Sequence, residues 1–72
     1  MKVYSIQTNW SADFGTFSTL EAAQKELEKL AEERKCKPGV REFEASKNKF
    51  SYIFGREEVE VSFFIKEIEV RD

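Results

Sequence analysis

The sequence contains no histidine and a single cysteine, Cys36. The scarcity of these two residue types excludes several kinds of catalytic and metal-binding site. Without histidine, the chain lacks the side chain that usually serves as a general base near neutral pH. A lone cysteine can form no internal disulfide, and it cannot build a zinc site without further cysteine or histidine ligands. The composition therefore predicts a protein that is not an enzyme and that holds neither a metal nor a cofactor.

Glycine and long apolar runs are also scarce. The three glycines stand apart at positions 15, 39 and 55, so the chain has no Gly-rich phosphate-binding loop. No apolar stretch approaches the roughly 20 residues that a membrane helix needs, and the first residues show no signal-peptide pattern. With a free thiol, these features predict a cytoplasmic protein without a membrane partner.

The composition that is present favours one small folded domain over residues 1–72. Seven phenylalanines, two tyrosines and one tryptophan supply large apolar surfaces to a chain that has no disulfide. The formal net charge of −2 predicts no direct binding to nucleic acid, because such binding depends on excess positive charge.

A helix is expected in the first half of the chain. Ser18 and Glu21 have the spacing of a capping box, which marks a helix start. Apolar side chains then recur at helical spacing, and Pro38-Gly39 ends the pattern. The residues of this apolar stripe are Leu20, Ala23, Leu27, Leu30 and Ala31.

Four strands are expected around this helix, at Lys2–Thr8, Val40–Ala45, Lys49–Phe54 and residues 58–70, with a loop from Asn9 to Gly15. The pattern predicts an α+β fold of order β-α-β-β-β. It consists of one four-stranded, mainly antiparallel sheet with a single helix packed on one face. The favoured arrangement is 2-3-4-1, counting strands along the chain, because it places the most apolar strand inside the sheet. The order 1-2-3-4 remains an alternative.

Two tight turns predict which side chains share a face. Gly55-Arg56 fits a two-residue type II′ turn and would set Tyr52 opposite Val59. Lys47-Asn48 would set Phe43 opposite Tyr52 in the preceding hairpin. Further along, the apolar alternation changes phase, which predicts a β-bulge near Lys66-Glu67. Both turns place the same side chains toward the helix, namely Phe43, Phe50, Tyr52, Val59 and Val61.

The same registers predict an acidic surface on the other face of the sheet. Glu42 and Glu58 would flank Ile53, and Glu44 and Glu60 would flank Ser51. Such a surface could be an ordinary solvated face. Alternatively, it could dock on a basic surface of a partner protein, such as the nucleic-acid groove of a nuclease.

Two aromatic residues are further candidates for partner contacts. Trp10 lies in a polar segment, and tryptophan is enriched at binding hot spots, although it could equally cover one end of the core. Phe64 is expected on the face away from the helix. A homodimer with Phe64 at its seam would cover this side chain, and the Trp10 loop or the end of the chain is the alternative cover.

The first third of the chain, KVYSIQTNW followed by FGTFSTLEAAQKELEKL, resembles small phage and prophage proteins in which a strand leads to a similar helix start. This resemblance implies a viral or mobile-element origin. The leading functional hypothesis is a non-enzymatic protein-binding module, such as an anti-CRISPR-like inhibitor of a host nucleic-acid enzyme or defence system. Two alternatives are a nucleotide-binding sponge at a homo-oligomer interface, with Arg34, Lys37 and Arg41 near phosphates, and a structural or assembly subunit.

Overall fold

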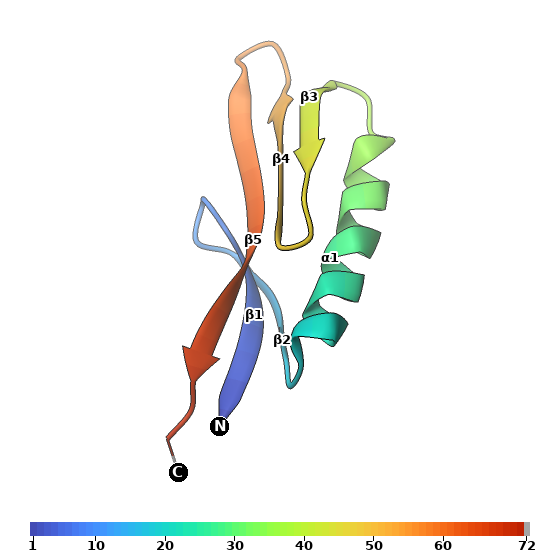
Figure 1. Ribbon diagram of the computed structural model, residues 1–72. Coiled ribbons are helices and arrows are strands. Elements are labelled where there is room, and N and C mark those ends of the chain that lie inside the picture. The colour runs from blue at the N-terminus through green and yellow to red at the C-terminus, as the bar shows by residue number, and fades with distance from the viewer. Residues whose placement is uncertain (72) are drawn as a thin grey trace.

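The computed structural model describes residues 1–71 as one antiparallel sheet with a single helix packed on one face (Figure 1). The elements are, in chain order, β1 (Lys2–Thr8), β2 (Asp13–Phe17), α1 (Leu20–Lys35), β3 (Val40–Ala45), β4 (Lys49–Phe54) and β5 (Val59–Glu69). The strand order across the sheet is β2-β1-β5-β4-β3. The α+β class and the favoured order of the predicted strands are confirmed, but the sheet has five strands rather than four.

The additional strand, β2, lies partly in the segment that was expected to be a loop. It pairs antiparallel with β1, and Tyr4 lies opposite Phe17. Its local sequence favours a turn, since the Asp13 carboxylate accepts a hydrogen bond from the Gly15 amide at 2.9 Å. Gly15 also has a φ of +127°. The extended form of this segment depends on the edge that β1 offers, and local propensity does not contain that information.

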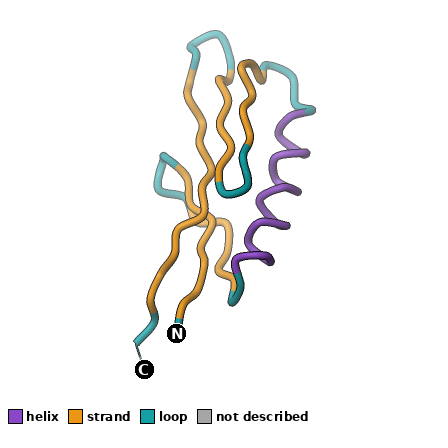
Figure 2. The backbone as a smooth tube through the Cα atoms, in the orientation of Figure 1, coloured by secondary structure: helices purple, strands orange, loops and turns teal. Residues whose placement is uncertain are grey.

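Among the described strands, only β5 runs through both ends of the sheet (Figure 2). Its first half pairs with β4 and its second half with β1, so β3 and β4 extend toward one end of the molecule and β1 and β2 toward the other. The described chain is 46 Å long and 20 Å wide. Phe63 lies where the two halves overlap, opposite Thr8 of β1 and Phe50 of β4.

The core between the sheet and α1 is a row of stacked aromatic rings. The Phe63 and Phe50 rings are nearly parallel, with centroids 4.6 Å apart, and Phe43 stacks on Phe50 at 5.8 Å. Such pairs contribute about 0.5–1.5 kcal/mol each beyond the area that they bury. This packing supplies the stability that the chain cannot take from a disulfide. The buried core cluster consists of Ile6, Leu27, Phe50, Tyr52 and Phe63.

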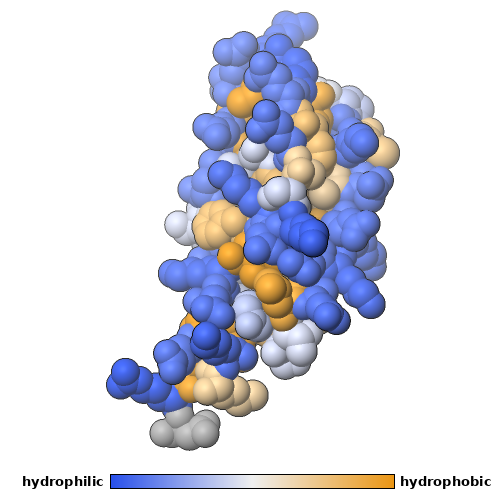
Figure 3. All heavy atoms as spheres, in the orientation of Figure 1, coloured by the Kyte–Doolittle hydropathy of each residue, from blue (hydrophilic) through white to orange (hydrophobic). Residues whose placement is uncertain are grey.

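The helix begins one residue later than the capping box predicts. Thr19, not Ser18, is the N-cap, and its hydroxyl oxygen accepts a hydrogen bond from the Ala22 amide at 3.2 Å. Ala23 and Leu27 are buried against the sheet, as the apolar stripe requires. The outward surface of α1, on the right of Figure 3, is largely hydrophilic.

The hairpin between β3 and β4 confirms the register that was expected next to its turn, since Ala45 lies opposite Phe50 and Glu44 opposite Ser51. Beyond Glu44 a bulge shifts the pairing by one residue. Glu42 carries the strain of this bulge, with a φ of +51°. As a result, Arg41 rather than Glu42 lies opposite Ile53.

The hairpin between β4 and β5 differs from the prediction by two residues. Residues 55–58 connect the strands, so Tyr52 lies opposite Val61 and Phe54 opposite Val59. The prediction of a type II′ turn at Gly55-Arg56 is therefore wrong. The chain uses a wider turn, with positive φ at Gly55 and Glu58. Since side chains alternate with a period of two, the shift leaves the paired side chains from Val59 to Phe64 on their predicted faces.

The predicted bulge near Lys66-Glu67 is also wrong. The register of β5 against β1 is continuous from Phe63 to Glu69. Ile68 simply lies on the face away from α1, opposite Val3 of β1. Both of these side chains are half-buried. The apolar phase changes because an apolar cross-strand pair lies on the face away from α1, and not because the backbone is irregular.

Candidate functional site

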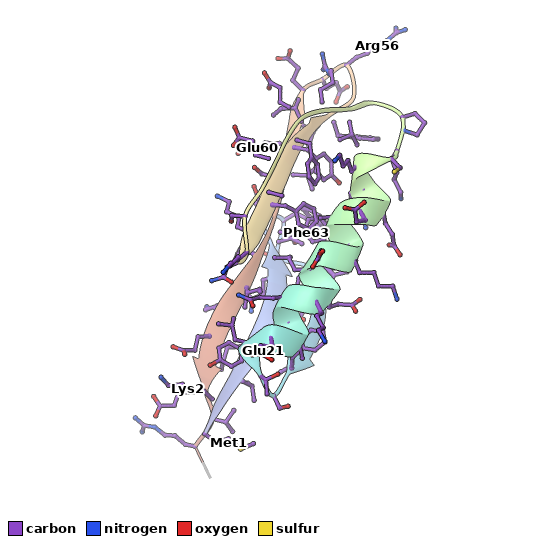
Figure 4. The ribbon with its side chains drawn as sticks, turned by 45° about the vertical axis from the view of Figure 1, so that its right-hand side comes forward. Met1, Lys2, Glu21, Arg56, Glu60 and Phe63 are labelled. Atoms are coloured by element: carbon purple, nitrogen blue, oxygen red, sulfur yellow. The ribbon has the colours of Figure 1, made fainter. Side chains whose placement is uncertain are left out.

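The face of the sheet away from α1 carries a shallow depression that is rich in carboxylates. Ile53 lies near its centre, with Glu60 directly opposite on β5. Glu60 projects away from α1, whereas Phe63 of the same strand points toward the helix (Figure 4). We call this surface the acidic depression. It has a volume of about 350 Å³ and is lined by Glu42, Glu44, Ser51, Tyr52, Ile53 and Glu60.

Three of the four predicted glutamates gather in the acidic depression, and Glu58 does not. Because the β4–β5 register is displaced by two residues, Glu60 takes the place beside Ile53 that was expected for Glu58. Ser62 similarly takes the expected place of Glu60 beside Ser51. Glu58 lies in the turn between the strands, where it is exposed.

Within the described residues, the carboxylates of the acidic depression form no salt bridge. Within residues 1–71, the salt bridge between Lys2 and Glu67, at 3.5 Å, is the only one. Arg41, the nearest cation in the sequence, instead donates a hydrogen bond from Nη2 to the carbonyl oxygen of Gly55 at 2.6 Å. Glu42, Glu44 and Glu60 are all exposed, so their negative charge is directed at solvent or at a partner.

Trp10 lies on the other side of the sheet from the acidic depression. Its ring packs edge-on against Phe63 at 5.4 Å and against Phe14 at 6.4 Å. The side chain therefore covers one end of the core, yet 50% of its surface remains exposed. The expectation that Trp10 covers one end of the core is confirmed, and its role as a partner contact stays a prediction.

The turn that carries Trp10 is clamped to β5 by Asn9. The Asn9 side-chain amide donates to the carbonyl oxygen of Glu60 at 2.8 Å and accepts from the Ser62 amide at 3.1 Å. The Asn9 backbone amide also donates to the Ser62 carbonyl oxygen at 3.2 Å. Asn9 thus continues the ladder past the end of β1 and closes the adjacent edge of β5. It gives Trp10 a fixed base.

A second hollow lies beside Trp10, between the last turn of α1 and the far ends of β4 and β5. We call it the Trp10 cleft, and its volume is about 380 Å³. The floor is apolar, and two cations from the end of the helix stand on its rim. The lining residues are Asn9, Trp10, Arg34, Lys37, Val40, Tyr52, Phe54, Val59, Glu60 and Val61.

The Trp10 cleft was not predicted from the sequence, although the length of the helix is a signal from which it could have been inferred. A helix of 16 residues spans about 24 Å, and the sheet is much longer. The ends of β4 and β5 therefore extend past the helix. Phe54 and Val59, which face the same side as the core, stay 44% and 51% exposed there.

Phe64 lies on the face away from α1, as expected. It is opposite Gln7 of β1 and Lys49 of β4, and it is half-buried. The homodimer seam that was predicted around Phe64 stays a prediction. The predicted basic group is divided, since Arg34 and Lys37 line the Trp10 cleft, whereas Arg41 reaches toward Gly55.

The described residues form no group of three or more side chains suited to holding a metal ion. Within the same residues, α1 is neither long nor apolar enough to cross a bilayer. No family model matches the chain, and neither a curated protein nor a solved structure is significantly similar to it. The resemblance to phage proteins therefore stays a prediction.

Proposed function

We propose that this protein is a non-enzymatic binding module whose acidic depression docks on a basic surface of another protein. The observation that carries this proposal is the convergence of Glu42, Glu44 and Glu60 around Ile53 on the open face of the sheet. The carboxylates provide charge complementarity, which accelerates association and selects partners. Ile53 provides an apolar contact at the centre of the acidic surface.

The arrangement fits a docking surface better than a surface that is acidic only for solubility. Glu42 is held at a φ of +51° by the β3 bulge, a conformation that costs an L-residue roughly 1–2 kcal/mol. The bulge brings Glu42 to the depression even though Arg41 occupies the position opposite Ile53. A face that needed charge only for solubility would not require this geometry.

The partner class that we propose is a nucleic-acid enzyme, such as a nuclease of a host defence system. Such enzymes bind phosphates through basic grooves, and a carboxylate surface is complementary to the same groove. In this proposal the protein acts as a stoichiometric inhibitor of the anti-CRISPR type. Its origin would be the phage or mobile element that its first third resembles.

The test is affinity capture from bacterial lysate, with identification by mass spectrometry, using three forms of the chain. These are the unchanged chain, the triple variant Glu42→Gln, Glu44→Gln, Glu60→Gln, and a control with Glu28→Gln, Glu33→Gln, Glu57→Gln. Both variants lose the same charge from exposed positions. A docking partner should be captured by the unchanged chain and by the control, but not by the first variant.

The captured complex should also weaken as salt rises, because the screening length shortens from about 10 Å at 0.1 M to about 3 Å at 1 M. Capture of the same proteins by the triple variant would contradict the proposal. Association that is indifferent to salt would contradict it as well, since the carboxylates would then contribute nothing.

A further inference from the structure

The Trp10 cleft is a separate surface from the acidic depression, and it gathers partly exposed apolar side chains. Trp10, Phe54 and Val59 are 50%, 44% and 51% exposed and line the same hollow. Clustered apolar exposure of this kind marks a binding site more often than scattered exposure does. A volume of about 380 Å³ is within the range of small-molecule sites.

The cleft is also preformed. Trp10 is fixed on one side by its edge contact with Phe63 and at its base by the Asn9 clamp. A site that is already ordered loses little conformational entropy when a ligand enters. The indole is therefore a wall against which a planar group could stack.

Two cations complete the site. The Arg34 guanidinium lies over the Phe63 ring at 5.3 Å from its centroid, and Lys37 follows one residue after the helix C-cap. Neither has a carboxylate within salt-bridge distance in the part of the chain that the structure describes. A positive rim beside aromatic walls is complementary to a ligand that combines a flat ring with a negative group.

We infer that the Trp10 cleft binds a small planar aromatic anion of the nucleoside monophosphate class. The ring stacks on Trp10 above Val59 and Val61, and the phosphate is held by Arg34 and Lys37. A peptide strand fits less well, because Asn9 already occupies the edge of β5 where a strand would pair.

This inference does not rest on the proposed protein docking. The cleft lies on the helix side of the sheet, and only Glu60 and Tyr52 line both surfaces. Either site can fail while the other holds. The experiment below therefore avoids every glutamate of the acidic depression.

Trp10 is the only tryptophan of the chain, so its fluorescence reports directly on the cleft. The probes are AMP, GMP, CMP and UMP, each titrated separately, with adenosine and inorganic phosphate as partial ligands. The indole is excited at the red edge of its absorption band, where nucleotides absorb little. At least one monophosphate should quench the emission to saturation, adenosine should bind at least about tenfold more weakly, and phosphate should leave the emission unchanged.

Lys37→Gln should weaken binding about tenfold, because it removes one charge-assisted contact. Lys35→Gln is the matched control, since it removes the same charge from a neighbouring exposed position that does not line the cleft. Val59→Glu places a carboxylate on the floor and should abolish binding. Unchanged urea denaturation would show that both cleft variants are folded.

Three results would each overturn the inference. The first is the absence of saturable quenching by all four monophosphates. The second is that adenosine binds as tightly as the monophosphate that binds best, which would show that the phosphate and the two cations do not interact. The third is equal binding by Lys37→Gln and Lys35→Gln in folded protein, which would place the ligand outside the cleft.

Discussion

Phe63 occupies the point at which the two halves of the sheet meet. Its side chain has no exposed surface, and it contacts rings from three other elements, namely Phe50 on β4, Phe14 on β2 and Trp10 in the turn after β1. The Arg34 cation covers it from the helix. Phe63 therefore joins the packing of both halves of the sheet to the helix.

Replacing the Phe63 ring by a small side chain should strongly destabilise the fold. Phe63→Ala is expected to lower the free energy of unfolding by about 3–5 kcal/mol. A chain of 72 residues has a total stability of about 4–11 kcal/mol, so much of the population would unfold. Urea denaturation followed by circular dichroism measures the loss, with Phe63→Leu as a milder variant. Phe54→Ala is the control, because that ring is 44% exposed and should cost less than about 1 kcal/mol. Equal losses at the two positions would contradict this account.

Asn9 is a second single residue that should stabilise the fold, through hydrogen bonds rather than packing. Asn9→Ala removes two contacts to the backbone of β5, one of them to Ser62, which is buried. The expected loss is about 1–3 kcal/mol, because each bond contributes about 1 kcal/mol and a buried amide loses its partner. Chemical denaturation measures it. Asn48→Ala is the control, since its side chain accepts one bond from the exposed Gln24 amide. It should change stability by less than about 0.5 kcal/mol.

At the scale of elements, the start of α1 separates two interpretations of the same sequence. The capping box pattern selects Ser18, whereas the structure uses Thr19. Thr19→Ala should therefore cost about 1 kcal/mol of stability, and Ser18→Ala should fall within about 0.5 kcal/mol of the unchanged chain. Thermal unfolding of the two variants side by side distinguishes them. A larger loss of stability for Ser18→Ala than for Thr19→Ala would indicate that Ser18 is the N-cap.

The elements also show what sequence patterns can and cannot predict. The helix, the order of the predicted strands and the inward faces of β4 and β5 follow from periodicity, which needs no knowledge of distant residues. The width of a turn is a different matter, because Gly55 suits both a two-residue and a four-residue connection. The β2 strand could not be predicted either, since its pairing depends on β1 and its own sequence favours a turn.

For the functional surfaces, the sequence predicts the face of the sheet on which a side chain lies better than it predicts the residue opposite on the next strand. Glu44 lies opposite Ser51 as predicted, and Glu60 lies on the predicted face because a two-residue shift preserves alternation. Glu58 lies outside the acidic depression because the two-residue shift of the β4–β5 register places it in the turn. The bulge that positions Glu42 has no signature in the local sequence. The Trp10 cleft arises from the mismatch in length between a helix and a sheet, which only the assembled fold displays.

At the scale of the whole molecule, the narrow shape predicts a gradient of backbone protection. β4 is paired on both sides and carries the buried Phe50 and Tyr52. The far ends of β1 and β5 form an extension in which Met1 and Val70 are exposed. Hydrogen exchange should therefore be slowest in β4 and much faster near Val3 and Ile68, because local opening needs few contacts to break there. Uniform protection along the sheet would contradict this expectation.

A strand that belongs to both halves has a further consequence for how the protein comes apart. Neither the pair β1–β2 nor the pair β3–β4 can keep a complete sheet once β5 leaves, because each relies on β5 for its inner neighbour. Although the molecule is elongated, it cannot be divided into two independently folded units, because β5 pairs with strands of both halves. Melting should consequently be all-or-none, with a calorimetric enthalpy equal to the van't Hoff enthalpy.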